Sequence, residues 1–194
     1  VALKRLIDEE SIADELIKRL SLILKTKIIG DPLDPTTDFG PLASLKQLER
    51  AEVQLHDAIS QGAKIAASLA VPKALKGAYL SPMIITNIKK SMKVWQEEVF
   101  APILPVVTFK TEAEAIELAN DTKYGLGGYV YSGDLDKAKR VASAIVSGNV
   151  SINGPEYYRH ENPFGGAKLS GIGRQKGTHG LQDICNIKVI ALKK

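Results

Sequence analysis

Two stretches in the first third of the chain repeat apolar residues at the spacing of an amphipathic helix. They cover residues 11–27 and residues 44–61, and Gly62 is placed to end the second helix. Ser11, with Asp14 three residues later, predicts a capping box at the start of the first helix. Residues 30–41 contain three prolines and two glycines, which disfavour a helix and predict an irregular connector. The apolar face of the first helix consists of Ile12, Leu16, Ile17, Leu20, Ile23 and Leu24.

The rest of the chain alternates short apolar runs with helical patterns. Strands are predicted at residues 64–69, 83–88, 103–109, 126–131 and 149–153, and helices at residues 112–120 and 135–146. Strands that are joined through helices run parallel and are usually buried on both faces. The sequence therefore predicts an α/β fold of three layers, α/β/α, around a mostly parallel sheet. The alternating tail, residues 184–192, predicts one last strand that pairs at a sheet edge or with another subunit.

Composition and charge restrict the class of protein. A chain of 194 residues with 44% hydrophobic and 25% charged side chains can form one soluble globular domain without a disulfide or a structural metal. No apolar run reaches the roughly 20 residues of a membrane helix, and residues 1–6 do not form a signal sequence. The net charge of +4 comes from lysines scattered among acids, which disfavours a nucleic-acid partner. The single cysteine, Cys185, is compatible with a reducing cytoplasm, where we expect the protein to be.

The segment E-E-V-F-A-P at residues 97–102 places an acid and an aromatic residue two positions apart. If the segment is extended, Glu98 and Phe100 share one face. A carboxylate accepts hydrogen bonds from a ribose diol and an aromatic ring packs on a planar heterocycle, so this pair suits a nucleotide cofactor. The alternative is a solvated Glu98 and a core Phe100, and the six residues by themselves favour that alternative.

Residues 162–174 contain four glycines and could form a phosphate cradle. The spacing of Gly171, Gly173 and Gly177 differs by one residue from the dinucleotide fingerprint, and no apolar strand leads directly into it. We therefore interpret the segment as a packed surface loop that shapes a pocket with Phe164.

A cysteine nucleophile with a histidine base would indicate a hydrolase, and Cys185 could pair with His160 or His179. No local pattern supports this pairing, because Cys185 falls inside the apolar tail, where a small buried thiol is the ordinary outcome. The three histidines, including His56, lack the spacing of metal ligands, so the sequence predicts no metal site.

Several of these segments, taken in order, resemble the aldehyde dehydrogenase superfamily, and the resemblance extends from Val1 to about Lys194. Ala101 stands where the family usually has glycine, and Gln175 stands where glutamate is common; the Ala101 methyl group is expected to shift the turn after Phe100. The similar segments are residues 97–102 (family pattern E-E-I/V-F-G-P), 120–126 (A-N-x-x-x-Y-G-L), 163–174 (P-F-G-G-x-K-x-S-G-x-G-R) and 30–42 (G-x-P-x-D-x-x-T-x-x-G-P).

The resemblance implies roles for individual residues. Glu98 would bind the nicotinamide ribose of NAD or NADP, and Phe100 would contact the nicotinamide. Gln47 is similar to a residue that approaches the cofactor in some members. Phe164 would line the tunnel through which the aldehyde enters, and residues 154–161 would shape its mouth.

The family's reaction begins with attack of a cysteine thiolate on the aldehyde. Hydride transfer to NAD(P)+ follows, and water activated by a glutamate then hydrolyses the thioester. Residues 1–5, V-A-L-K-R, resemble the segment directly after that cysteine. The resemblance therefore implies that residues 1–194 are the C-terminal part of the catalytic domain and contain no catalytic residue. The cysteine, the glutamate and the cofactor-binding domain would lie upstream of Val1, and the isolated chain would be inactive.

Two hypotheses follow: a part of a complete aldehyde dehydrogenase, or a stand-alone non-catalytic module that acts in oligomerisation or partner binding. Residues placed like cofactor contacts favour the first hypothesis.

Residues 180–188 are most similar to succinate-semialdehyde dehydrogenase relatives. With such a substrate, Arg159 could pair with the substrate carboxylate; the alternative is that Arg159 is an exposed loop arginine. Family members commonly form dimers or tetramers, so we expect a homo-oligomer through the C-terminal strand. The choice between NAD and NADP belongs to the missing domain.

Overall fold

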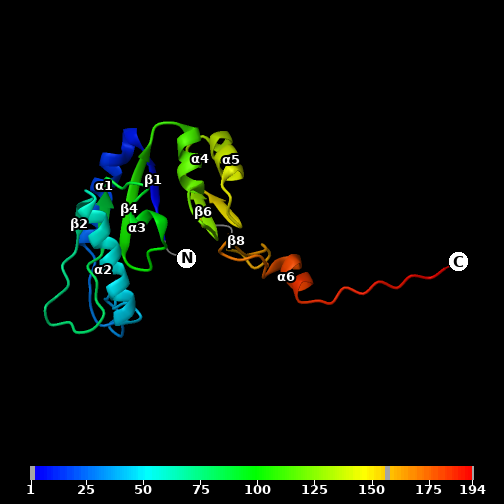
Figure 1. The fold of residues 1–194 in the computed structure, drawn as a ribbon, viewed down its shortest axis with the longest axis horizontal. Coiled ribbons are helices and arrows are strands. Elements are labelled where there is room, and N and C mark those ends of the chain that lie inside the picture. The colour runs from blue at the N-terminus through cyan, green and yellow to red at the C-terminus, as the bar shows by residue number, and fades with distance from the viewer. Residues whose placement is uncertain (1–2, 156–157, 194) are drawn as a thin grey trace. The chain divides into compact units, whose positions relative to one another are not determined.

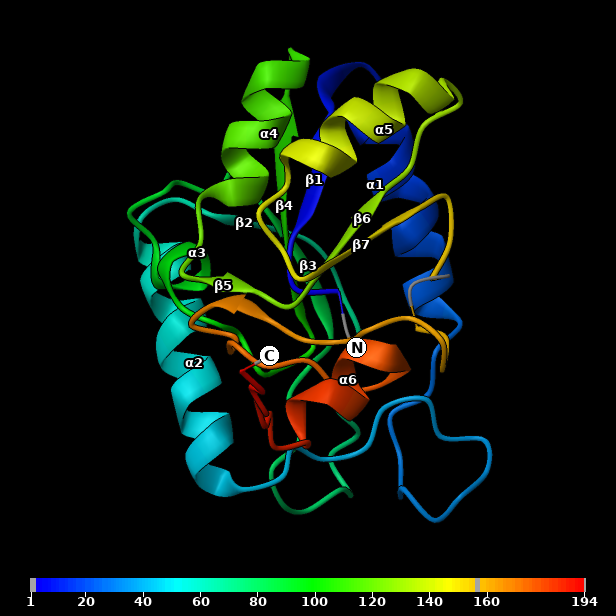
Figure 2. The same cartoon turned by 90° about the vertical axis from the view of Figure 1, so that its right-hand side faces the viewer.

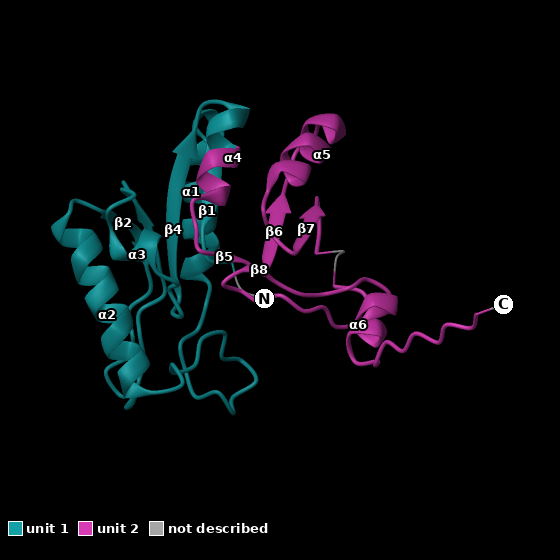
Figure 3. Cartoon of the chain, turned by 45° about the vertical axis from the view of Figure 1, so that its right-hand side comes forward, with its two compact units in different colours: residues 1–115 teal, residues 116–194 magenta. Residues whose placement is uncertain are grey.

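The structure, a computed structural model, describes residues 3–155 and 158–193 (Figure 1). The chain divides into two units, Val1–Ala115 and Ile116–Lys194, which are coloured separately in Figure 3. The two units contain separate sheets, and helix α4 (Glu112–Asn120) crosses the boundary between them in the sequence.

A four-stranded sheet is the centre of the first unit. Its strands are β1 (Leu6–Glu9), β2 (Lys64–Ser68), β3 (Met83–Thr86) and β4 (Ile103–Phe109), in the order β1-β4-β3-β2. Strand β4 runs parallel to β1 and to β3, whereas β2 is antiparallel to β3. The sheet is therefore mostly parallel, which confirms the predicted α/β class.

Helices cover both faces of this sheet. Figure 2 shows α1 (Glu10–Lys25) and α2 (Leu45–Ser60) on opposite sides of it. Because strand residues alternate between faces, Met83 and Ile85 face α2, and the buried Ile84 between them faces the other way. This confirms three layers in the first unit. The core on the α2 side consists of Ala51, Ala58, Ala63, Met83, Ile85, Met92, Val94, Val99 and Ile103.

The two long helices of the first unit start in different ways. Helix α2 begins after Ser44, whose hydroxyl accepts a hydrogen bond from the Gln47 backbone N–H at 3.2 Å. The capping box at Ser11 is wrong: β1 runs directly into α1, the cap position is Glu9, and the Ser11 hydroxyl donates to the Glu9 carboxylate at 3.1 Å. Helix α1 therefore starts directly after β1 without a side-chain cap.

The second unit contains the predicted β-α-β arrangement. Strands β6 (Gly127–Val130) and β7 (Asn149–Ile152) pair in parallel, and α5 (Leu135–Ala144) joins them and packs on both. The Asp134 carboxylate caps α5 by accepting the backbone N–H groups of Asp136 and Lys137 at 2.9 and 3.0 Å. Two further short strands, β5 (Tyr124–Gly125) and β8 (Ala167–Lys168), form an antiparallel pair.

The tail differs from the sequence prediction. A short helix, α6 (Gly177–Asp183), ends the regular structure, and the residues from Ile184 to Lys193 form no strand. Ile187 is 94% exposed and Cys185 is also exposed, so the expected strand is not confirmed in the single chain, and the expected burial of the thiol is wrong for it. A strand needs a neighbour for its N–H and C=O groups, and the described part of the chain places none beside this segment.

Asp8 on β1 is buried, with 6% of its surface exposed, and its Oδ2 atom has no hydrogen-bond partner among the described residues. Burial raises the pKa of Asp8 and the Glu9 charge raises it further, although a hydrogen bond from the Glu9 backbone opposes the shift. A raised folded-state pKa means that Asp8 contributes stability below its unfolded pKa of about 4, and that this contribution is lost as pH rises through the folded pKa.

We therefore expect Asp8→Asn to be more stable than the parent near neutral pH, with the difference shrinking as the pH falls through the raised folded-state pKa of Asp8 toward about 4. The asparagine has no charge to bury but keeps an oxygen for the Glu9 N–H. Urea unfolding at several pH values measures this. Equal stabilities of parent and variant at neutral pH would show that the ionised carboxylate is not destabilising.

Candidate functional site

The predicted cofactor segment lies between α3 (Lys93–Gln96) and β4, where the chain leaves a single helical turn in extended form. Val99 is 3% exposed and belongs to the core, Glu98 is half-buried, and Phe100 is 60% exposed. This alternation agrees with an extended segment whose two outer residues share one face. The alternative, in which Phe100 is a core residue, is wrong.

Three successive carbonyl groups of this segment accept hydrogen bonds from side chains that are distant in sequence. Gln54 donates its Nε2–H to the Glu98 carbonyl at 3.4 Å, and Lys4 donates its Nζ–H to the Val99 carbonyl at 3.1 Å. Gln47 donates its Nε2–H to the Phe100 carbonyl at 2.5 Å. The Lys4 ammonium also lies 4.0 Å from the centre of the Phe100 ring. The backbone of residues 98–100 is thus held from outside the segment.

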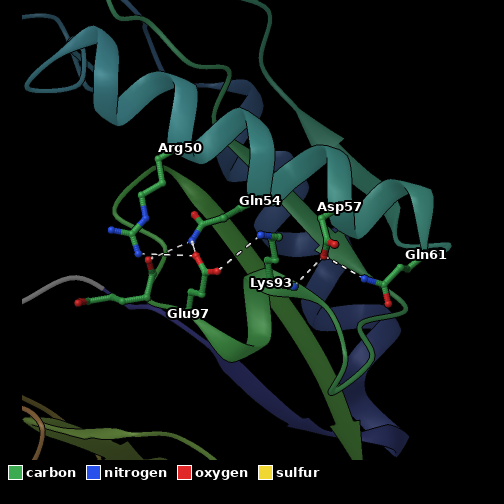
Figure 4. A network of polar contacts seen from close by, with 7 residues as sticks. Arg50, Gln54, Asp57, Gln61, Lys93 and Glu97 are labelled. Carbon is green, nitrogen blue, oxygen red and sulfur yellow. Dashed lines mark hydrogen bonds and ion pairs between the residues drawn. The ribbon is translucent and has the colours of Figure 1, made fainter.

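The two adjacent glutamates have different surroundings. The Glu97 carboxylate accepts a hydrogen bond from Gln54 at 2.9 Å and forms ion pairs with Arg50 at 3.6 Å and Lys93 at 3.9 Å (Figure 4). For the Glu98 carboxylate, no donor is found among residues 3–155 and 158–193. A half-exposed carboxylate with free acceptor sites beside an exposed ring fits a ribose diol and a nicotinamide.

Two cationic side chains of the glycine-rich segment, residues 162–174, donate hydrogen bonds to main-chain carbonyl groups. Lys168 donates to the carbonyls of Asn120 and Thr122, each at 3.0 Å. Arg174 donates to the carbonyls of Gly166 and Gly173 at 2.8 and 2.9 Å. These two side chains therefore bind main-chain oxygens, and this supports the interpretation of the segment as a packed loop.

Close backbone approach explains two of the glycines in this region. A Cβ atom at Gly148 would lie 1.9 Å from the Gly165 carbonyl oxygen, and one at Gly165 would lie 2.2 Å from the Gly173 carbonyl oxygen. The buried Asn149 side chain donates to the same Gly165 carbonyl at 2.9 Å. The loop that carries Phe164 is therefore packed directly on the chain before β7.

Phe164 is half-buried and its backbone is fixed on both sides, because its N–H and C=O bond those of Gln175 at 2.7 and 2.8 Å. The Tyr158 ring meets it edge to face with 5.3 Å between centroids. The Lys176 ammonium lies 3.6 Å from the centre of the Tyr158 ring and 6.0 Å from that of Phe164. The structure thus brings two aromatic rings and a cation together at the residue predicted to line the aldehyde tunnel.

Arg159 is exposed, next to this aromatic pair in the sequence. The predicted tunnel mouth, residues 154–161, includes Glu156 and Tyr157, which lie outside the described residues. In the described part of the chain, no hydrogen bond joins Cys185 to a histidine, and no group of three potential ligands is placed to hold a metal ion. None of the described helices is long and apolar enough to cross a membrane.

Sequence reasoning did not identify Lys4 or Gln54. Lys4 has no local signal, because its acceptor is 95 positions away. Gln54 does have a local signal in the sequence, because it lies among Ala51, Leu55 and Ala58 on the inward side of a predicted helix. A glutamine there must find a hydrogen-bond partner when buried.

Comparison with known proteins agrees with the fold. Residues 1–190 match the sequence model of a protein family described as "Aldehyde dehydrogenase family". The chloroplastic betaine aldehyde dehydrogenase of Atriplex hortensis is 43% identical over 190 residues, and the match covers 97% of this chain and 38% of the relative. The succinate-semialdehyde dehydrogenase (NADP(+)) of Deinococcus radiodurans is 38% identical, with 98% and 40% covered.

Among solved structures, a betaine aldehyde dehydrogenase from Staphylococcus aureus in complex with NAD+ matches with a TM-score of 0.85 and 40% identity, covering 92% of this chain and 36% of the other. The chain therefore belongs to the aldehyde dehydrogenase family. It spans about two fifths of the length of these relatives.

Proposed function

We propose that the complete protein oxidises an aldehyde to a carboxylic acid with NAD+ or NADP+ as the hydride acceptor. The balance is aldehyde, water and NAD(P)+ giving carboxylic acid, NAD(P)H and a proton. Family membership supports the reaction class. The observation that carries the proposal for this chain is the contrast between the fully engaged Glu97 carboxylate and the open Glu98 carboxylate beside an exposed Phe100 ring.

In this proposal, Glu98 accepts hydrogen bonds from the two hydroxyl groups of the nicotinamide ribose. Phe100 packs on the nicotinamide, and Gln47 lies beside the same site through its bond to the Phe100 carbonyl. When bound, the nicotinamide cofactor supplies the hydride acceptor. The part of these three residues is to place the nicotinamide ring and to limit its movement.

The nucleophile and the base are proposed to precede Val1 in the complete protein, with the domain that binds the rest of the cofactor. The only cysteine of the chain, Cys185, is an exposed tail residue without a bond to a described histidine, so this chain is proposed to be inactive by itself. The proposed location is the cytoplasm, with which a chain that has a single cysteine is compatible.

A second candidate is a stand-alone module that acts through its tail. The apolar side chains of Ile187, Val189, Ile190 and Leu192 are all exposed, which suits a strand that pairs with another subunit. The same pairing is proposed for the complete enzyme, as a homo-oligomer, so the tail itself does not separate the two candidates.

Native and denaturing mass spectrometry of the protein from its source cells separates them. A subunit much heavier than 21.0 kDa that contains this sequence, in an assembly of several subunits, supports the enzyme. A subunit of 21.0 kDa would overturn it in favour of the module. A strictly monomeric protein at high concentration would contradict the proposed pairing of the tail.

For the substrate, we propose a carboxylated aldehyde similar to succinate semialdehyde, with Phe164 lining its path and Arg159 pairing with its carboxylate. The Lys176 ammonium against Tyr158 adds positive charge near Phe164. The same contact shows that these rings can accept a cation, so a cationic aldehyde such as betaine aldehyde is the second candidate.

Arg159→Ala in the complete enzyme is expected to raise KM for succinate semialdehyde about tenfold, because a charge-assisted hydrogen bond at a partly exposed site is lost. KM for an uncharged aldehyde should remain near the parent value, and KM for betaine aldehyde should not rise. Steady-state kinetics with the three substrates measures this. An equal change for all three would remove Arg159 from substrate recognition.

A further inference from the structure

Helix α2 carries a row of polar side chains that faces residues 91–100. The row is formed by Gln47, Arg50, Gln54, Asp57 and Gln61, the last residue lying just beyond the helix. Their spacing of three and four residues places them on one side of the helix. Figure 4 shows Arg50, Gln54 and Asp57 directed toward Glu97 and Lys93.

Gln54 is the buried member of this row. It is 2% exposed and lies beside Ala51 and Ala58, which are part of the core. Burying a primary amide costs free energy unless it is hydrogen-bonded. Gln54 is bonded twice, to the Glu97 carboxylate at 2.9 Å and to the Glu98 carbonyl at 3.4 Å. The amide thus joins the core to the two glutamates.

The same helix face holds both ends of α3. At its start, the Asp57 carboxylate accepts the Lys93 backbone N–H at 2.7 Å, and it also accepts the Gln61 amide at 3.0 Å. At its end, Gln54 and Arg50 hold Glu97, the residue that ends the helix. The turn from which Glu98 projects is therefore fixed to α2 at two points.

We infer that Gln54 is a positioning residue for the cofactor. It fixes the main chain at Glu98 so that the open carboxylate stands where the ribose hydroxyls bind, and Gln47 fixes the Phe100 carbonyl in the same way. The inference rests on the proposed function, in which Glu98 binds the ribose. Gln54 does not touch the cofactor in this account, and it acts through the backbone of its neighbours.

Gln54→Leu tests this role, because leucine fills a similar volume but donates no hydrogen bond. Misplacement of a bound group by about 1 Å can cost about 100-fold in rate, so an effect of about tenfold is expected from loss of one of several tethers. The dissociation constants for NAD+ and NADP+ should rise about tenfold, while KM for the aldehyde should stay near the parent value.

The experiment uses the complete protein with two readouts besides activity. Calorimetry gives the dissociation constants for NAD+ and NADP+, and hydrogen–deuterium exchange of the cofactor-free protein reports on residues 97–101. Faster exchange there together with weaker cofactor binding supports the inference. Gln54→Met repeats the test if the leucine variant does not fold, because methionine adapts to the same space.

Gln61→Leu is the matched control. Gln61 is in the same row and bonds Asp57, but it has no bond to residues 97–100. Parent-like cofactor binding by Gln61→Leu is expected. Equal weakening by both variants would show a general effect on α2 and would overturn the inference.

A Glu98→Gln variant separates failure of this inference from failure of the proposed function. If Glu98→Gln loses cofactor affinity and Gln54→Leu binds like the parent, Gln54 is not a positioning residue and the proposed function stands. If Glu98→Gln also binds like the parent, Glu98 is not the ribose ligand and the inference fails with the proposed function.

Discussion

Replacing Glu98 with glutamine in the complete protein is expected to weaken NAD+ or NADP+ binding by about ten- to a hundredfold. Hydrogen bonds to a charged group are worth about 1.5–3 kcal/mol each, and the carboxylate can accept one from each ribose hydroxyl. Glutamine has about the same size as glutamate but only one acceptor oxygen. One hydrogen bond from the ribose is therefore lost, and the other is then made to a neutral acceptor instead of a charged one. Calorimetric titration of the cofactor measures the change.

Glu49→Gln is the control for the change in net charge. Glu49 is exposed on α2 and has no bond to the cofactor segment. Its replacement should leave the dissociation constant at the parent value. If both glutamine variants bound the cofactor like the parent, Glu98 would be a solvated surface residue, the alternative that its local sequence favours.

Replacing Gly148 with alanine is expected to destabilise the second unit by about 3 kcal/mol. The new Cβ atom would lie 1.9 Å from the Gly165 carbonyl oxygen, and main-chain atoms of Gly165 and Gly166 are the next neighbours. Backbone atoms on a glycine-rich loop cannot rotate aside as a side chain can, so the loop must move. The Asn149 bond to the same carbonyl should be strained with it.

Gly133→Ala is the matched variant in the same unit, since a Cβ there meets no heavy atom within 4 Å. It should be neutral or stabilise slightly, because alanine restricts the unfolded chain. Urea unfolding of both variants gives the comparison. Similar midpoints for Gly148→Ala and the parent would mean that the loop tolerates a shift away from β7.

The regular parts of the fold could be predicted because their signals are local. Helix α4 and strand β4 have the predicted bounds, and α2 differs from its predicted range by one residue at each end. Strand β1 was not predicted, because L-I-D-E has no alternating pattern. These residues form a strand by pairing with β4, about a hundred residues away in the sequence. Helix α6 was not predicted either, since G-T-H-G-L-Q-D contains two glycines, and glycine disfavours a helix.

The site was predictable only in part, for the same reason. Glu98 and Phe100 are two residues apart, so an extended segment sufficed to place them on one face. The bonds that hold them come from Lys4, Gln47 and Gln54, at separations of 44 to 95 positions. No local pattern specifies which helix face will meet which loop.

The predicted strand in the tail is not confirmed in the single chain. Residues 184–192 have a strand pattern, but a pattern specifies only which side chains could share a face, and the hydrogen-bond partner must come from elsewhere. In the single chain the apolar side chains are exposed, and so is Cys185. The predicted burial of the thiol depends on that strand, and it is wrong for the single chain.

The most direct test of the account is the reaction itself. The complete protein, expressed from the natural reading frame that contains this chain, is mixed with succinate semialdehyde or betaine aldehyde and with NAD+ or NADP+. The account predicts one equivalent of reduced cofactor and one of carboxylic acid per aldehyde consumed, with at least one of these pairs. A folded complete protein that forms no reduced cofactor with any of the pairs would contradict it.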